Sequence, residues 1–521
     1  MKKLLLLSFL LLILSTSFAQ WTSPGDGSTF YLRNLVQISN GCVTQTWPDG
    51  TYYIHGDLTI SPNDCLVIDR DDCPIILNTH VPCDVVCEGN ITIQGSFRCM
   101  VAHNADAIFR TENDDCHICF DHCTDPCFIS STSFQELSGI RLVESAVSFT
   151  FCHFQSFNTA YTSGAVNYMN CSPVFIGCYF FNNQGAAISS GANVTGSPQI
   201  LGCWMESNGL SNQNQPQINL GPGAEDTIRI EDNIIFGYED PIPLKHNASS
   251  VTMVGGVAVS DLLQTGSTKV LLKDNTIANN RYGYTQQGYA IDAVIENNEI
   301  YDNNAGDDPM TGGSGISIYG YSTDCKAKLR NNNISGNYWG ITAIYYYDID
   351  MGTADDYGYN IIYDNHNNGY GSDQTYALYV NGFNDITAIG NYWGGPDEAY
   401  DESVIYHRPD LGETYGLVTY SPVLPQVPTM VSQQEAPTFT LYPNPAPRKT
   451  VITLSRNNVN NVNNANNVPS SSFLITSPLG QPLLTGPILS NPFQIDLSSL
   501  PKGLYFITIG NQTQKLIIGN P

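Results

Sequence analysis

One short sequence pattern recurs nine times along this chain of 521 residues. An apolar residue is followed, after two residues, by Asn or Cys, and then, after one more residue, by a second apolar residue. Successive copies lie about 30 residues apart, and stretches of alternating apolar and polar residues, typical of half-buried strands, lie between them. A unit of this length cannot bury its own apolar face. We therefore predict that the units stack as coils, with parallel strands roughly 4.8 Å apart around one continuous core.

The Asn or Cys of each copy is interpreted as the same turn in successive coils. An Asn at that turn can donate and accept amide hydrogen bonds along the stack, and it tolerates left-handed backbone. A Cys fills the same space without those bonds. We predict a structural turn ladder, and not a ligand site, that consists of Cys152, Cys178, Cys203, Asn233, Asn275, Asn298, Asn332, Asn360 and Asn391.

The repeats resemble a known family. Together with the closing Gly-Asn-Tyr-Trp-Gly-Gly of residues 390–395 and a stretch from Asp49 that looks like an entry coil, they are similar to the right-handed parallel β-helix of pectate-lyase-like proteins. The resemblance implies an all-β protein, with an N-terminal segment at 20–48 and the β-helix at 49–420. It specifies the fold and not the function, because lyases, hydrolases, epimerases, copper-related periplasmic proteins and adhesins share it.

The N-terminus predicts export. Lys2 and Lys3 precede an apolar run at 4–14, and small residues before Gln20 form a cleavage site, as in a secretory signal peptide of residues 1–19. The apolar run is too short to span a membrane, so we expect no transmembrane anchor. The chain has 48 acidic and 21 basic residues, a net charge of −27, which argues against nucleic acid as a partner.

The C-terminal residues differ from the rest in charge and in motifs. Residues 437–521 hold one acidic and five basic side chains and follow a Pro/Gln-rich linker at 421–436, so we predict a separate, small β-sandwich-like domain. It contains an Asn-rich loop at 457–467. Three ordered motifs resemble the type A sorting domain of the type IX secretion system found in Bacteroidetes, and they supply Tyr442, Pro443, Asn444, Pro445, Gly503, Leu504, Tyr505 and Lys515.

This second resemblance implies a partner and a location. The type IX secretion machinery would recognise the tail after the chain has entered the periplasm. The tail would typically be removed, and the protein would be secreted or attached to the outer surface of the outer membrane.

A candidate substrate surface follows from the first resemblance. In pectate-lyase-like enzymes the substrate lies along the strand that follows the loop of each coil. A lyase needs a Lys or Arg base, often with a cation held by carboxylates, and a hydrolase needs facing carboxylates. The predicted row offers one Arg and no carboxylate, and its polar and aromatic residues suit either a sugar-binding face or a solvated one: Arg141, Asn167, Ser189, Asn219, Ser317, Tyr319, Thr342 and Tyr379.

Two other clusters could hold a metal ion. Asp348, Asp350, Asp355 and Asp356 are dense enough in oxygen ligands for Ca²⁺, although a hydrated acidic loop is the simpler interpretation. Asp307 and Asp308 form a smaller acidic pair. The adjoining tyrosines at 345–347 could be a sugar-stacking platform or the alternating core and surface of a strand.

The cysteines are concentrated near the N-terminus. Fourteen of the 15 lie between Cys42 and Cys203, and in an exported protein disulfides are the default expectation. The spacing of Cys116, Cys119, Cys123 and Cys127, with neighbouring histidines, could also hold Zn²⁺. The pairing cannot be derived from the sequence, and the odd total leaves at least one thiol free or paired between chains.

Three functions are compatible with the sequence. The leading hypothesis is an exported β-helix that binds an extracellular polysaccharide, or another surface, without catalysis. The main alternative is a polysaccharide lyase or glycoside hydrolase, and the third is a structural component of the cell surface.

Overall fold

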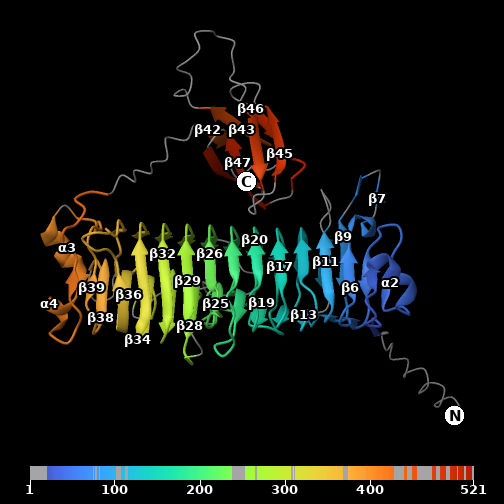
Figure 1. Cartoon of the computed structure of the whole chain (residues 1–521), viewed down its shortest axis with the longest axis horizontal. Helices are drawn as coiled ribbons and strands as arrows, with labels where there is room; N and C mark the ends of the chain where they lie inside the picture. Colours follow the sequence, from blue (N-terminus) through green and yellow to red (C-terminus); the bar gives the residue numbers. More distant parts are fainter. Residues whose placement is uncertain are drawn as a thin grey trace, which may run out of the picture.

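The structure is a computed structural model in which a long parallel β-helix is followed by a small antiparallel domain (Figure 1). The predicted signal peptide and the Asn-rich loop lie outside the described residues. The structure describes residues 20–73, 75–76, 79–80, 82–100, 107–111, 115–237, 253–264, 267–306, 309, 311–367, 374–395, 397–427, 439–442, 449–454, 472–476, 482–487, 493–500, 503–509 and 512–518.

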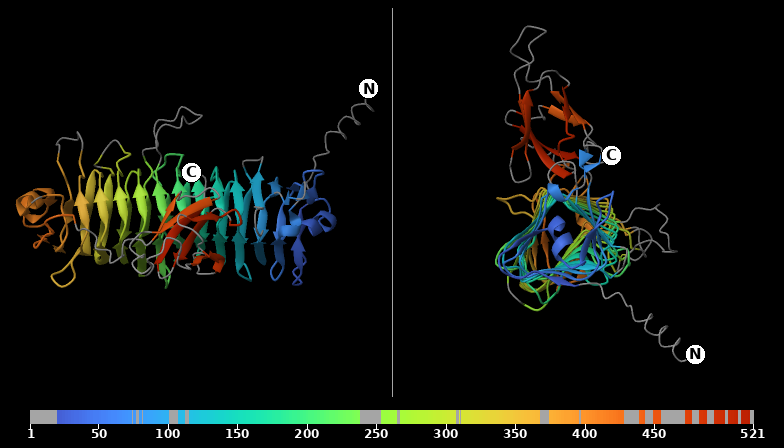
Figure 2. Two further views of the ribbon diagram at one scale, coloured as in Figure 1. Left: turned by 90° about the horizontal axis from the view of Figure 1, so that it is seen from above. Right: turned by 90° about the vertical axis from the view of Figure 1, so that its right-hand side faces the viewer.

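Up to β37 (Ile361–Tyr363), each coil of the β-helix contributes three strands, which we name first, second and third in chain order. In one coil these are β19 (Gly164–Met169), β20 (Val174–Ile176) and β21 (Tyr179–Phe181). Each pairs in parallel with its counterpart in the next coil, β22 (Ala186–Ser190), β23 (Gln199–Leu201) and β24 (Trp204–Glu206). The end-on view in Figure 2 shows the three sides. The predicted right-handed parallel β-helix is confirmed.

The first strands form one continuous ladder along the molecule. Their outward surface, the first-strand face, is the surface on which the sequence places the candidate row. The remaining first strands are β1 (Trp21–Thr22), β5 (Leu58–Ile60), β10 (Ile91–Ile93), β13 (His117–Asp121), β16 (Gly139–Val143), β25 (Ile218–Leu220), β28 (Val257–Asp261), β31 (Tyr284–Gly288), the beginnings of β34 (Ser314–Arg330) and β36 (Trp339–Asp350), β38 (Leu378–Gly382) and β40 (Ile405–Tyr406).

The second strands continue the same sheet on the next side of each coil. They are β2 (Thr29–Tyr31), β6 (Cys65–Ile68), β11 (Ser96–Met100), β14 (Cys127–Ser130), β17 (Val147–Thr150), β26 (Thr227–Glu231), β29 (Thr268–Lys273), β32 (Ile291–Glu296), the ends of β34 and β36, β39 (Ile386–Thr387) and β41 (Val418–Thr419), besides β20 and β23.

The third strands form a separate sheet. Its parallel members are β4 (Tyr52–Ile54), β9 (Cys83–Cys87), β12 (Ala107–Thr111), β15 (Thr132–Gln135), β18 (His153–Gln155), β27 (Ile234–Phe236), β30 (Thr276–Ala278), β33 (Glu299–Tyr301), β35 (Asn333–Ser335) and β37 (Ile361–Tyr363), besides β21 and β24. The short strand β3 (Val43–Gln45) adds to it in the antiparallel sense, and β7 (Ile75–Ile76) and β8 (Thr79–His80) form a separate hairpin.

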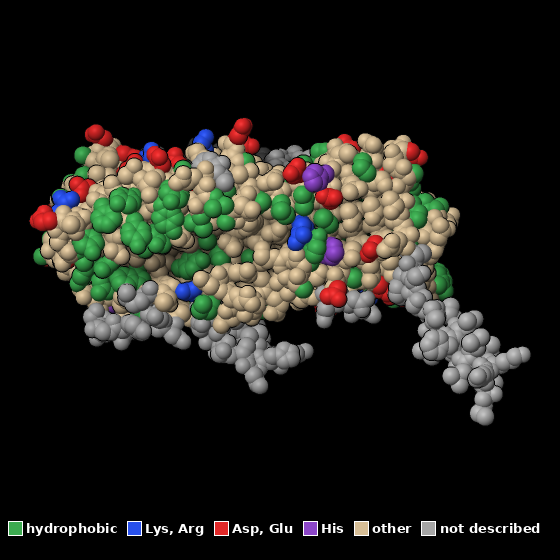
Figure 3. All heavy atoms as spheres, turned by 90° about the horizontal axis from the view of Figure 1, so that it is seen from below, with side chains coloured by type: hydrophobic (Ala, Val, Ile, Leu, Met, Phe, Trp, Pro, Cys, Tyr) green, Lys and Arg blue, Asp and Glu red, His purple; other side chains and the backbone are tan. Residues whose placement is uncertain are grey.

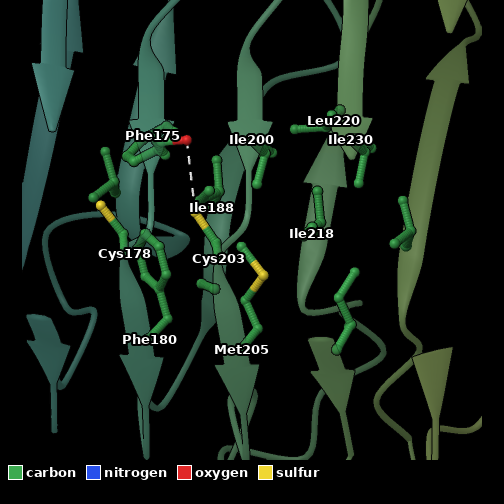
Figure 4. Packing of buried hydrophobic residues seen from close by; sticks show 14 of the residues in the cluster. Phe175, Cys178, Phe180, Ile188, Ile200, Cys203, Met205, Ile218, Leu220 and Ile230 are labelled. Atoms are coloured by element: carbon green, nitrogen blue, oxygen red, sulfur yellow. Dashed lines mark hydrogen bonds between the residues drawn. The ribbon is translucent and has the colours of Figure 1, made fainter. Parts of the chain in front are cut away.

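The core is a column of apolar side chains that point inward from all three sides. Because strands of neighbouring coils are in register, equivalent side chains stack on one another. The rings of Phe154 and Phe180 lie 4.4 Å apart, and those of Phe149 and Phe175 lie 5.4 Å apart. Figure 4 shows how aliphatic residues continue these columns into the next coils. Stacking therefore buries an apolar face that a single coil would expose.

The predicted turn ladder lies between the second and third strands and is buried. The Oδ1 of Asn298 accepts hydrogen bonds from the backbone N–H of Asn275 (3.0 Å) and from its Nδ2 (2.9 Å). The Nδ2 of Asn298 in turn donates to the Oδ1 of Asn332 and to the carbonyl of Leu272. The pattern repeats from Asn233 to Asn391, so each amide is bonded on both sides.

The cysteines at this turn do more than fill space, which corrects the prediction. The thiol of Cys178 donates to the carbonyl of Phe149 (3.4 Å). The thiol of Cys203 donates to that of Phe175 (3.6 Å), as Figure 4 shows. In later coils the Asn side chains donate to the equivalent carbonyls, as Asn233 does to that of Ile200. The Cys203 backbone N–H then joins the two series by donating to the Oδ1 of Asn233 (2.8 Å).

A second amide ladder follows the third strands. It begins with Asn183 and Asn208 and continues with Asn280 and Asn303. The coil between them has no Asn at this position, and Gln217 spans the gap: its Oε1 accepts from Asn208 (2.9 Å) and its Nε2 donates to Asn280 (2.9 Å).

Segment 20–48, which the sequence-based division separates from the β-helix, supplies its first coil. β1 and β2 pair in parallel with β5 and β6, and α2 (Leu32–Ile38) follows β2 with Leu32 and Leu35 buried. In the last coil, α3 (Glu398–Val404) precedes the first strand β40, and α4 (Arg408–Leu411) lies between β40 and the second strand β41. No helix in the described segments has the length and apolarity needed to cross a membrane.

The helix α3 contains a buried acidic residue, Asp401, that makes the stability of the fold depend on pH. Asp401 is 2% exposed, and its Oδ1 has no hydrogen-bond partner among the described residues. Burial, followed by the nearby carboxylates of Asp397 and Glu398, raises the pKa of Asp401 to about 6. The folded state therefore binds the proton more tightly than the unfolded state does.

We expect the stability that protonated Asp401 contributes to be present below about pH 4 and lost as the pH rises through about 6. Asp401→Asn should raise the free energy of unfolding at pH 8 by about 3 kcal/mol and change it little at pH 4. Thermal unfolding of both proteins at the two pH values measures this. An equal effect of the substitution at pH 4 and pH 8 would contradict the assignment.

The C-terminal domain has two antiparallel sheets that enclose a small core of their own. One sheet contains β42 (Phe439–Tyr442), β43 (Lys449–Leu454) and β46 (Phe493–Asp496). The other has the order β45 (Pro482–Pro487), β44 (Ser472–Thr476), β47 (Gly503–Ile509) and β48 (Gln512–Ile518). The predicted small β-sandwich-like domain is confirmed, although the sequence did not predict β45.

Candidate functional site

The structure places seven of the eight predicted row residues on one line of the first-strand face. Arg141, Asn167, Ser189 and Asn219 are consecutive partners in register. Ala258 and Thr285 continue the line. It then passes through Ser317, Thr342 and Tyr379 and ends at Tyr406. Tyr319 lies two residues further along β34, on a parallel line.

Arg141, the one candidate base, is held by its neighbours. Its guanidinium carbon lies 4.1 Å above the ring of Tyr161, and its Nη2 donates to the Tyr161 carbonyl at 2.7 Å. The ring of His117 stacks on Tyr161 with centroids 3.6 Å apart, and burial lowers the pKa of His117. The partners of Arg141 along its line are Cys119 and Asn167, so neither neighbour supplies a carboxylate.

Two of the predicted row residues do not face solvent, which corrects the prediction for them. Ser189 is fully buried because Ser163 covers it (Oγ to Oγ 2.9 Å) and Asn167 Nδ2 donates to its Oγ at 3.0 Å. Thr342 is 8% exposed, and its hydroxyl bonds to that of Ser314 at 3.0 Å. A ligand on this face would therefore contact neither side chain without rearrangement.

Four aromatic rings, which we call the aromatic patch, cluster at the C-terminal end of the line. The ring of Trp339 lies 4.6 Å from that of Tyr376 and 5.1 Å from that of Tyr379. Tyr406 lies 4.9 Å from Tyr376 and 6.0 Å from Tyr379, onto which it stacks at 18°. All four are half-buried. The Trp339 Nε1 donates to the carbonyl of Pro309 at 2.8 Å, which fixes that ring.

A second group of rings, the tyrosine strip, borders the patch. It contains Tyr289, Tyr319, Tyr321 and Tyr345, whose neighbouring ring centroids lie 5.2 to 5.4 Å apart. Tyr345 is 45% exposed. Figure 3 shows hydrophobic side chains gathered near the C-terminal end of the underside of the β-helix. Monomeric proteins seldom expose such contiguous groups without a binding role.

The run of tyrosines at 345–347 divides between surface and core. Tyr345 and Tyr346 are exposed, whereas Tyr347 is 1% exposed inside the β-helix. Tyr346 also contacts Phe383 at 5.1 Å. The division between core and surface that the sequence offered as one alternative is therefore observed, with two of the rings turned outward at the corner of β36.

The acidic cluster at 348–356 is occupied by cationic side chains. Arg330 Nη2 lies 2.7 Å from an oxygen of Asp350 and 2.9 Å from one of Asp356, and Lys328 Nζ lies 2.9 Å from Asp356. These partners hold the pKa of Asp356 at about 2. Within the described ranges, no three His, Cys, Asp or Glu side chains gather as a metal site. Asp307 and Asp308 lie outside them.

All 15 cysteines are free thiols in the structure, and most are buried. Burial raises the pKa of Cys99 to about 12 and that of Cys325 to about 11. In the run considered for zinc, burial raises the pKa of Cys116 and of Cys119, whereas a hydrogen bond with Cys127 lowers the pKa of Cys123. The run from Cys116 to Cys127 likewise forms no metal cluster among the described residues.

Of the aromatic patch, the sequence-based row contains Tyr379 and lacks Trp339, Tyr376 and Tyr406. A sequence pattern could have identified the first two of these three. Trp339 and Tyr376 each directly precede a small residue, Gly340 or Ala377, near the beginning of a first strand. The two rings come from adjacent coils, in which the Gly340 N–H donates to the Tyr376 carbonyl at 2.8 Å. Aromatic residues at this position in consecutive repeats indicate a ring cluster. Tyr406 had no such signal, because the last first strand follows the helix α3.

Comparisons with known proteins identify the tail and part of the β-helix. Residues 440–519 match the secretion system C-terminal sorting domain, which indicates export by type IX secretion to the cell surface or the medium. Residues 206–397 match a protein family of unknown function designated DUF1565. A comparison with curated proteins finds no match.

Solved structures with some similarity are parallel β-helix proteins. A mutant of the periplasmic alginate epimerase AlgG is 10% identical, over 76% of this chain and 84% of that one, with a TM-score of 0.40. Unmutated AlgG is 12% identical, over 75% and 83%, with a TM-score of 0.33. A double mutant of the tailspike protein of E. coli bacteriophage HK620 is 12% identical, over 98% and 88%, with a TM-score of 0.34.

Proposed function

We propose that this exported β-helix binds an extracellular polysaccharide along the C-terminal half of its first-strand face, without cleaving it. The observation that carries the proposal is the aromatic patch. Its four rings come from consecutive coils, touch one another and remain half-exposed. Rigid aromatic rings give a large apolar contact at low entropic cost, and the C–H faces of sugar rings match such a surface.

The polar groups around the rings suit the hydroxyls of a sugar. Ser317 on β34 and Asn381 on β38 project from the same face, with β36 between the two strands. Burial raises the pKa of Tyr379 and of Tyr406, so both hydroxyls stay protonated and can donate as well as accept. A binding site with ring faces and a few placed hydrogen-bonding groups follows the usual composition of ligand sites.

The catalytic alternative has less support on this face. A glycoside hydrolase needs two carboxylates about the scissile bond, and the described first strands from β31 to β38 carry no Asp or Glu. A lyase needs a free base, and the row offers only Arg141, which is stacked on Tyr161 and bonded to its carbonyl. Binding without catalysis therefore fits the residues of this face better than a hydrolase or a lyase does.

A panel of soluble neutral and uronate-containing polysaccharides tests the proposal by affinity electrophoresis of the full chain. Retarded migration with at least one polymer is expected, with no release of reducing ends and no ultraviolet absorbance of unsaturated uronate products. Binding to none of the polymers would overturn the proposal. Product release during the same incubation would favour the lyase or hydrolase instead.

A further inference from the structure

The sorting domain contacts the β-helix at one kind of turn, the turn between second and third strands. In each coil, one residue directly precedes the Cys or Asn of the turn ladder, and these residues occupy equivalent positions in successive coils. The Phe151 N–H donates to the carbonyl of Ile176, and the Asp232 N–H donates to that of Lys273, in the same way in both coils. Phe151 and Asp232 therefore project from equivalent corners, three coils apart.

The two coils between them carry no side chain at this corner. The equivalent residues are Gly177 and Gly202, whose N–H groups make the same type of bond to the following coil. Later coils place Asp274 and Asn297 there. The corner row thus has one ring and one carboxylate separated by two glycines. Figures 1 and 2 show the C-terminal domain beside these coils.

Phe151 packs into the small core of the sorting domain. Its ring stacks on that of Tyr505, with centroids 5.3 Å apart at 27°. Gly503 lies so close that a Cβ there would stand 2.4 Å from Phe151 Cδ1. Tyr505 is itself fully buried. Gly503 and Tyr505 belong to the sorting motif, so the β-helix covers part of that motif.

Lys515, the last motif residue, makes the second contact. Its Nζ donates to the backbone carbonyl of Asp232 at 3.1 Å and lies 4.0 Å from the Asp232 Oδ1. Desolvation at this contact lowers the pKa of Lys515 despite the nearby carboxylates. The acidic β-helix and the basic tail, opposite in charge, favour such a contact electrostatically.

We propose that the sorting domain docks on the β-helix of its own chain through Phe151 and Asp232. Docking covers Gly503, the face of Tyr505 that stacks on Phe151, and the amine of Lys515, so access to these parts of the motif depends on release from the β-helix. The partner surface is the corner row of residues 151, 177, 202 and 232. Presentation of the export signal is therefore coupled to the folded state of the protein that is exported.

A zero-length carbodiimide, which joins an amine to a carboxylate that it touches, tests the proposal on the full chain. We expect mass spectrometry to find a peptide that links Lys515 to Asp232. The ion pair between Lys273 and Glu296, 2.9 Å apart within the β-helix, gives an internal reference link. A mixture of isotope-labelled and unlabelled chains separates links within a chain from links between chains.

Two variants and a control decide the outcome. Phe151→Ser should reduce the link at least about five-fold relative to the reference, because a contact worth about 1 kcal/mol is lost. Serine is acceptable at this turn, since Ser131 occupies the same position in the preceding coil. Asp232→Asn should abolish the link. Tyr359→Ser changes the equivalent corner in a distant coil and should have no effect.

Acetylation of Lys515 gives a second readout of release. We expect Phe151→Ser to increase its modification by about five-fold under the same conditions. An absent link in the wild-type chain, despite an intact reference link, would overturn the proposal. So would a link that joins only different chains, or one that Phe151→Ser leaves unchanged.

Discussion

Replacing Asn298 with alanine is expected to lower the free energy of unfolding by about 3–5 kcal/mol, since buried polar groups lose their partners. The side chain is 1% exposed. Its removal takes the acceptor from the backbone N–H and the Nδ2 of Asn275, and the donor from the carbonyl of Leu272. Water cannot reach these groups inside the stack, so each pays a desolvation cost.

Urea unfolding followed by circular dichroism measures this effect, with Asn381→Ala as the matched control. Asn381 is exposed on β38, and a surface substitution of this kind usually changes stability by less than about 0.5 kcal/mol. Cys178→Ala should fall between the two, because a thiol is a weak donor. Equal, small effects of Asn298→Ala and Asn381→Ala would show that the ladder contributes little to stability.

The sequence predicts the β-helix well because its dominant interactions repeat. Each Asn of the ladder bonds to the Asn of the next coil, so spacing along the chain translates directly into stacking in space. Gln217 could not be predicted, because it reaches the second ladder from the beginning of a strand and not from the repeat position. The place of β1 and β2 in the first coil was also missed, since that coil lacks the Asn or Cys signal.

The surface is less predictable than the core. Alternation along a strand correctly places Arg141, Asn219 and Ser317 on the outer side. It cannot show that Ser189 is covered, because the covering side chain, Ser163, comes from the loop before its neighbouring strand. Likewise, the sequence shows the carboxylates of Asp350 and Asp356 but not that Arg330 lies between them.

The tail motif illustrates a further limit. Gly503 and Tyr505 were identified through family resemblance, which describes what a domain is and not what it contacts in a given chain. Their contact with Phe151 depends on a turn residue more than 300 positions away. That residue has an aromatic side chain where most coils have a small or polar one. The repeat shows the ring at this corner, but only the structure shows that the C-terminal domain packs on it.

Replacing Tyr379 with alanine is expected to weaken binding of a polysaccharide by about 10- to 30-fold, the loss typical of a central aromatic contact. Tyr379 touches Trp339, Tyr376 and Tyr406, so its removal takes away one ring and loosens the other three. Because Tyr379 is half-buried on the surface, the circular dichroism of the variant should stay that of the wild type.

Two further variants show whether the loss of polysaccharide affinity in Tyr379→Ala comes from the lost ring contact. Tyr379→Phe keeps the ring and removes the hydroxyl, so affinity within about three-fold of the wild type would assign the energy to ring contact, since a hydrogen bond contributes roughly 1 kcal/mol. Tyr363→Ala removes a tyrosine that is 39% exposed on the third-strand face, away from the proposed site. Isothermal titration with the polymer selected by electrophoresis gives the constants. If Tyr363→Ala weakened binding as much as Tyr379→Ala, the ligand would not lie on the aromatic patch.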